Sequence, residues 1–180
     1  MDKRHLDQLL QQVAAGKVSP AEAYEVLKTL PFQDLGFVNI DQHRNIRTGY
    51  PEAVFCQGKT SAQIGEIFVK LAESNDNIMG TRATTENYDV VRGLVPDALY
   101  YEEARMIVVN RDPQPKHDRT VAVVTAGTAD IPVAEEAAIT AMMLGNPVDR
   151  IYDVGVAGIH RLFAKLDRIR QAHVVIVVAG

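Results

Sequence analysis

The sequence predicts an α/β fold made of an N-terminal helical hairpin, a small α/β domain and a doubly wound parallel-sheet domain. Three observations favour this class. Apolar residues recur at helical spacing near the N-terminus, strand and helix signals alternate through the middle, and Val121–Val124 form a continuous apolar run typical of a parallel strand buried on both faces. We place the hairpin at residues 1–30, the small domain at 31–110, a linker at 111–119 and the parallel-sheet domain at 120–180.

The N-terminal segment predicts two short helices joined by a tight turn. Its first apolar face consists of Leu6, Leu9, Leu10 and Val13. Gly16 then ends the run, as a glycine after a helix C-terminus does, and Ser19, Pro20 and Glu22 form a capping-box start for a second helix through about Leu30. Because nothing in this hairpin carries chemistry, we expect it to serve packing or assembly.

The small domain is predicted from alternating strand and helix signals. Strands are expected at 36–40, 53–58, 77–82 and 98–110, the last stretch holding one or two of them. Helices are expected at 60–73 and 84–94, with a polar loop at 41–52.

The C-terminal domain is predicted to follow a β-α-β-α-β order. Strands are expected at 120–125, 148–155 and 173–180, and helices at 132–146 and 159–172. Glycines cluster at the strand ends, as expected where helices and strands of a parallel sheet alternate. The segment 111–119 is rich in proline and charge, which favours a linker.

Composition excludes several classes of function. The formal net charge of −4 argues against a nucleic-acid partner. No apolar stretch approaches the roughly 18 residues that span a bilayer, and the start has no signal-peptide core, so we predict a cytoplasmic protein with no membrane partner. The single cysteine, Cys56, excludes an internal disulfide and is expected to be buried and inert.

Ligands of parallel α/β sheets bind beyond the carboxyl ends of the strands, here the loops 125–130, 153–161 and 178–180. Asp130 lies near a helix N-terminus, which favours phosphate or carboxylate ligands, although a plain helix N-cap is the alternative for this residue. His160 and Arg161 stand at another helix start, where the macrodipole disfavours cations. An anion between them would explain the pair, with Arg161 binding it in bidentate fashion and His160 donating a proton or hydrogen bond. A solvated arginine beside a satisfied histidine is the alternative.

The candidate binding residues of these loops, besides Asp130, His160 and Arg161, are Thr125, Ala126, Gly127, Thr128, Asp153, Gly155, Val156, Ala157, Gly158 and Gly180. In the small domain, Lys59 at a helix start is a further candidate for phosphate, together with Arg44 and Arg47, although a capped helix with a solvated lysine is equally compatible. The surrounding "CQGKT" lacks the upstream glycine of a P-loop, and nearby Asp, His and Glu residues lack the spacing of metal ligands, so no metal site is predicted.

Three stretches carry a resemblance over nearly the whole chain: "GFVNIDQHRNIRTGYPEAVFCQGKT", "VVTAGTADIPVAEEAAITA" and "IYDVGVAGIHRLF". They closely resemble the LarB family, pyridinium-3,5-biscarboxylic acid mononucleotide synthase. The last domain is similar, more distantly, to class I aminoimidazole ribonucleotide carboxylase/mutase, although Gly127 and Ala129 stand where that enzyme has serines.

The resemblance implies a reaction on nicotinic acid adenine dinucleotide. The pyridinium ring would be carboxylated with CO2 or bicarbonate and the phosphoanhydride hydrolysed to release AMP, the first step of the nickel pincer cofactor used by lactate racemase. Asp130 and His160 would transfer protons, while Arg161 and the glycine-rich loops would hold the diphosphate and carboxylates. No tightly bound cofactor is implied, Mg²⁺ is an open alternative, and a homo-oligomer is expected.

The sequence departs from the family at its C-terminus. The family continues past "VVIVVAG" into a half-domain whose cysteine adds to the pyridinium ring, whereas this chain stops at Gly180 and Cys56 does not match that cysteine. We therefore expect a truncated carboxylase-like domain that is inactive as given and leaves "VVIVVAG" as an unpaired apolar sheet edge. The alternatives are an aminoimidazole ribonucleotide mutase-like enzyme and a nucleotide-binding module without chemistry.

Overall fold

The computed structural model describes residues 3–28, 33–34, 36, 39–40, 50, 52–113 and 117–180. The predicted N-terminal helices are α1 (Lys3–Ala14) and α2 (Pro20–Lys28). Gly16 takes a φ of 69° at the end of α1, and the capping box is formed, with the Ser19 N–H donating to Glu22 (2.8 Å) and the Glu22 N–H to the Ser19 hydroxyl (3.2 Å). Gly16 and the capping box thus set the end of α1 and the start of α2, as the sequence predicts.

The small domain contains a four-stranded sheet of order β3-β4-β6-β5. Its strands are β3 (Ala53–Phe55), β4 (Asn77–Thr81), β5 (Leu99–Tyr101) and β6 (Met106–Asn110), of which only β3 and β4 run parallel. A separate antiparallel pair joins β1 (Gln33–Asp34) to β2 (Asn39–Ile40). The predicted strand at 98–110 is therefore a hairpin of two strands.

Helices α4 (Ser61–Ala72) and α5 (Thr85–Leu94) cover one face of this sheet. Each begins at a threonine whose hydroxyl accepts the N–H three residues later, and the side-chain oxygen at that later position accepts the threonine N–H. Ile64, Phe68 and Val91 are fully buried between these helices and the strands. The apolar side chains of α4 that recur at helical spacing thus form part of the core of this domain.

The C-terminal sheet is parallel, with order β8-β7-β9. Its elements in chain order are β7 (Val121–Thr125), the 3₁₀ turn η1 (Thr128–Asp130), α6 (Ile131–Met143), β8 (Val148–Ile151), η2 (Val156–Gly158), α7 (Ile159–Phe163), α8 (Leu166–Gln171) and β9 (Val174–Val178). Every residue of β7 is buried, as its continuous apolar run predicts. Val121 and Val123 contact α6, while Ala122 and Val124 contact residues of α7 and α8. Helices therefore cover both faces, and the predicted doubly wound arrangement is confirmed.

One predicted helix is wrong in its length. The single helix expected at 159–172 is two short helices, α7 and α8, separated at Ala164 and Lys165. The Lys165 N–H donates to the Leu162 carbonyl three residues back (3.0 Å), which tightens the last turn of α7 and redirects the chain. Both helices still place an apolar side chain, Leu162 or Ile169, on the sheet.

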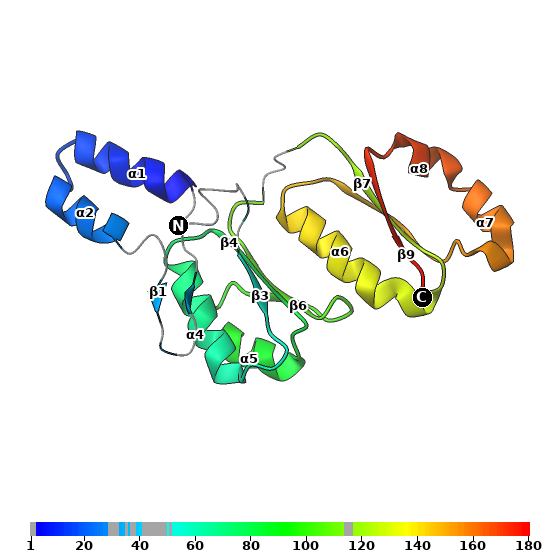
Figure 1. The fold of residues 1–180 in the computed structure, drawn as a ribbon, viewed down its shortest axis with the longest axis horizontal. Coiled ribbons are helices and arrows are strands. Elements are labelled where there is room, and N and C mark those ends of the chain that lie inside the picture. The colour runs from blue at the N-terminus through cyan, green and yellow to red at the C-terminus, as the bar shows by residue number, and fades with distance from the viewer. Residues whose placement is uncertain are drawn as a thin grey trace.

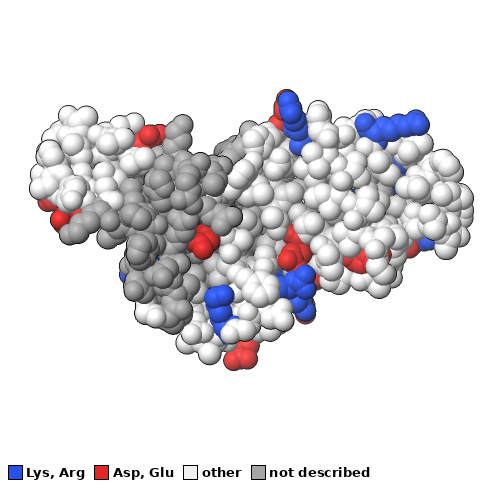
Figure 2. All heavy atoms as spheres, in the orientation of Figure 1, with Lys and Arg blue, Asp and Glu red and all other residues white. Residues whose placement is uncertain are grey.

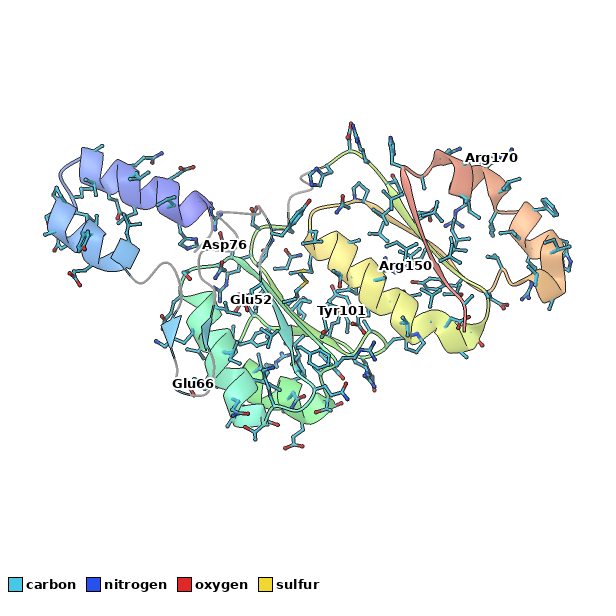
Figure 3. All side chains as sticks on the ribbon, in the orientation of Figure 1. Glu52, Glu66, Asp76, Tyr101, Arg150 and Arg170 are labelled. Atoms are coloured by element: carbon cyan, nitrogen blue, oxygen red, sulfur yellow. The ribbon has the colours of Figure 1, made fainter. Side chains whose placement is uncertain are left out.

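Helix α6 packs against both sheets. Its Ala134 and Ala138 lie on the parallel sheet, whereas Ile139 and Met143 pack with Met106 and neighbouring residues of the four-stranded sheet. Figure 1 shows α6 between the two sheets, and in Figure 3 Tyr101 of the four-stranded sheet lies on the side facing it. An ion pair between Arg82 and Glu136 (2.8 Å) adds a polar contact across the same boundary. This double contact explains why the helix sequence is apolar on more than one side.

The segment predicted as a linker is anchored at both ends. The Asn77 side chain donates to the Asp112 carbonyl (2.8 Å) and accepts its N–H (3.0 Å), and the His117 N–H donates to the Gly145 carbonyl (3.2 Å). Residues 114–116 lie outside the described part.

Strand β9 lies at the outer edge of the parallel sheet, pairing with β7. Its Val174, Val175 and Val177 side chains are exposed, in agreement with the apolar edge that the sequence predicts.

Among the described helices, none is long and apolar enough to cross a membrane. Figure 2 shows acidic and basic side chains interspersed over the described part of this face.

Candidate functional site

The three predicted loops meet at the carboxyl edge of the parallel sheet. The Ala126 N–H donates to the Val178 carbonyl (3.1 Å), and the Gly155 N–H donates to the Ala126 carbonyl (2.8 Å). The Gly180 N–H donates to the Asp130 carboxylate (3.2 Å), which ties the end of β9 to the first loop. Figure 1 shows the C-terminus beside the start of α6. The loops therefore form one continuous surface.

Asp130 is the central side chain of this surface. It is buried, and its two carboxylate oxygens accept the N–H groups of Gly127 (2.8 Å) and Gly180 (3.2 Å). It precedes α6 but makes no side-chain cap to that helix, so the plain N-cap alternative does not describe its contacts. Each oxygen retains a second lone pair for a donor on a ligand.

Thr125 and Asp153 connect the first two loops through hydrogen bonds. Thr125 is fully buried, and its hydroxyl accepts the Asp153 N–H (3.0 Å), while its carbonyl accepts the Val154 N–H (3.0 Å). Asp153 takes a left-handed φ of 59°, a conformation that aspartate adopts more readily than most side chains. The Thr125 side chain is thus engaged in holding the loops together.

Two glycines permit close approaches, one to the backbone of another loop and one to a side chain. A Cβ on Gly155 would lie 2.6 Å from the Ala126 carbonyl oxygen, and one on Gly158 would lie 2.6 Å from Arg161 Nε. Gly155 therefore serves contact between two loops, and Gly158 leaves room for the arginine side chain to fold back. The sequence pattern located these glycines but not the atoms they accommodate.

Arg161 pairs with Asp153 through its Nη1 atom, and both side chains are only partly exposed. This pair was not predicted, because the two residues are eight positions apart across an irregular turn. The guanidinium keeps further N–H donors for an anion. His160 is exposed beside it in the first turn of α7, as are Thr128, Val156 and Ala157 on the loops.

A partly buried polar cluster that the sequence analysis missed supports the second loop. Arg150 donates two hydrogen bonds to Glu135 (2.8 and 3.1 Å), and the Tyr152 hydroxyl donates another (2.6 Å). Burial would raise the pKa of the Glu135 carboxyl, but the hydrogen bonds from Arg150 and Tyr152 hold it below its ordinary value. Burial and the bond to Glu135 raise the pKa of the Tyr152 phenol. Arg150 lies in β8 (Figure 3 labels it beside α6), and Tyr152 follows two positions later, just past the end of the strand. This two-residue spacing is the signal that could have revealed them.

Lys59 is not among these loops. It follows the carboxyl end of strand β3 in the four-stranded sheet, where its ammonium donates to the Phe55 carbonyl (2.6 Å). The predicted candidates Arg44 and Arg47 lie outside the described residues. Within the described ranges, no three His, Cys, Asp or Glu side chains are grouped as metal ligands.

Cys56 is buried, as predicted, with a side chain 1% exposed. Burial raises the pKa of its thiol from 9.0 to about 11, although the positive charge of Lys59 opposes this rise. At pH 8 roughly one thiol in a thousand is then ionised, and the thiolate is the reactive form. We expect iodoacetamide to modify native Cys56 about 100-fold more slowly than the urea-unfolded chain, as measured by intact mass. Equal rates in the two states would contradict an inert thiol.

The comparisons with known proteins agree with this architecture. Residues 32–111, which hold the four-stranded sheet and its helices, match the model of the LarB/PurE-like N-terminal domain. An uncharacterized protein of Methanocaldococcus jannaschii is 33% identical over 193 aligned positions, which cover 98% of this chain and 73% of that protein. The chain belongs to the LarB family. Because the alignment covers nearly the whole chain, the relationship extends beyond the N-terminal domain to the parallel sheet and its loops.

Membership in the LarB family indicates a carboxylase/mutase-like protein. The geometry is compatible with this class, since small-molecule sites of parallel α/β sheets lie at the edge where the three loops meet.

Proposed function

We propose that this LarB-family chain binds nicotinic acid adenine dinucleotide for carboxylation of its pyridinium ring. In the proposed reaction a nucleophile adds to the ring, the resulting dihydropyridine attacks CO2 through C5, and the C5 proton and the nucleophile then leave. Water cleaves the phosphoanhydride and releases AMP beside the biscarboxylated mononucleotide. A positively charged ring does not attack CO2 until such an addition makes it electron-rich, which is why the proposal includes a covalent step.

The observation that carries this proposal is the convergence of the three loops at one sheet edge, which carries the Asp130 carboxylate and the Arg161–Asp153 pair. The free donors of Arg161 suit the diphosphate or a ring carboxylate. Asp130 keeps lone pairs directed away from its two backbone donors, and exposed His160 can exchange protons with a bound substrate. Together these groups supply anion binding and proton transfer at one sheet edge.

The nucleophile of the proposed reaction is not Cys56. This thiol, the only cysteine of the 180-residue chain, is buried and predominantly protonated at neutral pH. The three loops provide substrate-binding groups, and the described part of the chain offers no reactive thiolate beside them.

Binding and turnover can be measured separately on the 180-residue chain. We expect calorimetry to show binding of nicotinic acid adenine dinucleotide. We expect mass spectrometry after incubation with ¹³C-bicarbonate to show neither carboxylated mononucleotide nor AMP above the rate without protein.

The results of these binding and turnover measurements distinguish between the candidate functions. Carboxylated product from the 180-residue chain would contradict the expected inactivity while supporting the proposed reaction. Absence of dinucleotide binding, with the fold verified by circular dichroism, would overturn the proposed substrate. Binding of aminoimidazole ribonucleotide in preference to the dinucleotide would favour the mutase-like alternative.

A further inference from the structure

A cavity lies at the carboxyl ends of the parallel strands β3 and β4, away from the three loops. Its volume is about 860 Å³, within the range of small-molecule sites. It is bounded by the β3–α4 connection, the β4–α5 connection and the β5–β6 turn. Most of its lining residues are polar, so the cavity is unlike the apolar grooves left by imperfect packing.

Each of the three segments contributes one cation: Lys59, Arg82 and Arg105. Arg82 is already paired with Glu136 of α6. In the described part of the chain, neither Lys59 nor Arg105 has a carboxylate within ion-pair distance. Arg82 and Arg105 also hold left-handed φ values of 54° and 50°, where glycine is the least strained residue. Two cations without carboxylate partners therefore border a cavity large enough for an organic anion.

Backbone donors reinforce these cations. The capping threonines of α4 and α5 satisfy the N–H groups of the third helical residues, Gln63 and Asn87. The earlier N–H groups of each helix, including those of Ser61 and Thr85, have no carbonyl partner within the helix. Both residues line the cavity, and partial positive charge at a helix start favours an anion.

Two carboxylates, Glu86 and Glu102, also line the cavity. Their charge disfavours a bare polyanion, but their oxygens can accept hydrogen bonds from hydroxyl groups. We propose that this cavity binds a sugar phosphate, with the phosphate monoester held by Lys59, Arg105 and the helix-start N–H groups and the sugar hydroxyls held by the carboxylates. This site is separate from the three loops and does not depend on the proposed reaction.

The test uses ribose 5-phosphate as the probe and backbone-amide NMR of the 180-residue chain as the readout. We expect ribose 5-phosphate to shift the amides of residues 58–62 and 83–87. Inorganic phosphate should bind more weakly to the same amides, and ribose alone should cause no shift. Lys59→Gln and Arg105→Gln should each weaken ribose 5-phosphate binding about ten-fold, because each removes a charge from a phosphate contact. Glu102→Gln should weaken ribose 5-phosphate more than inorganic phosphate.

Lys70→Gln is the matched control, because Lys70 pairs with Glu73 near the opposite end of α4 and does not line the cavity. It should leave binding unchanged. Shifts confined to the loops 125–130 and 153–161, or binding abolished by Arg161→Ala but unaffected by Lys59→Gln and Arg105→Gln, would overturn the proposal. Equal affinity for inorganic phosphate and ribose 5-phosphate would overturn the sugar-phosphate assignment. Failure of the dinucleotide to bind at the loops would leave all of these outcomes unaffected.

Discussion

Gly155→Ala is expected to destabilise the chain by about 3 kcal/mol. The added methyl group would lie 2.6 Å from the Ala126 carbonyl oxygen, so the second loop must move away and lose the 2.8 Å hydrogen bond from the Gly155 N–H. Overpacking costs about 1–3 kcal/mol and loss of the hydrogen bond about 1 kcal/mol. Urea unfolding followed by circular dichroism measures the change in free energy of unfolding.

Gly127→Ala is the matched control on the neighbouring loop. Its added Cβ would lie 3.6 Å from an Asp130 carboxylate oxygen, an ordinary contact, at a φ of −123° that any residue adopts. We expect its free energy of unfolding to stay within about 0.5 kcal/mol of the starting chain. Equal destabilisation by both substitutions would show that the close approach at Gly155 is not the cause.

Arg161→Ala is expected to weaken binding of nicotinic acid adenine dinucleotide by about 10- to 100-fold in calorimetry. Hydrogen bonds to charged groups contribute about 1.5–3 kcal/mol, and alanine removes every guanidinium donor that Arg161 could offer to the proposed diphosphate. Arg161→Lys should restore part of the affinity, because lysine keeps the charge but not the planar fork of donors. Higher ionic strength should reduce the difference between arginine and alanine.

Arg168→Ala supplies the control for removal of a surface arginine. Arg168 also pairs with an aspartate, Asp149, but it lies on α8 rather than on the three loops. Its removal should leave dinucleotide binding unchanged, because Arg168 does not lie on the three loops. Loss of its exposed ion pair should change stability by only about 0–1 kcal/mol.

Asp153→Asn tests whether the partner carboxylate orients Arg161. Unaltered affinity in Arg161→Ala would refute a binding role for the guanidinium and leave its contact with Asp153 as a structural one.

Much of the fold was predictable because local chemistry determined it. The capping residues set the starts of α2, α4 and α5, and the apolar run of β7 identified a strand buried on both faces. Since parallel strands place their carboxyl ends at one edge, the convergence of the loops around Asp130 followed from topology. Those features depend on residues close in sequence or on a general rule of α/β sheets.

The remaining features depend on contacts between distant segments. The Arg161–Asp153 pair and the Glu135–Arg150–Tyr152 cluster require the exact path of the chain between them. The apolar character of α6 indicated burial but not its second partner, the four-stranded sheet. The break between α7 and α8 comes from a tightened turn that no glycine or proline marks. Sequence periodicity carries no direct information on such tertiary choices.

The position of α6 has a consequence for dissecting the molecule. If the chain were cut at the linker, the first fragment would keep α4 and α5 but lose the helix that covers Met79, Met106 and Val108. Those side chains would then face water as an apolar patch, and the fragment would tend to self-associate. The boundary visible in the sequence therefore separates two topological units but does not separate two independently soluble ones.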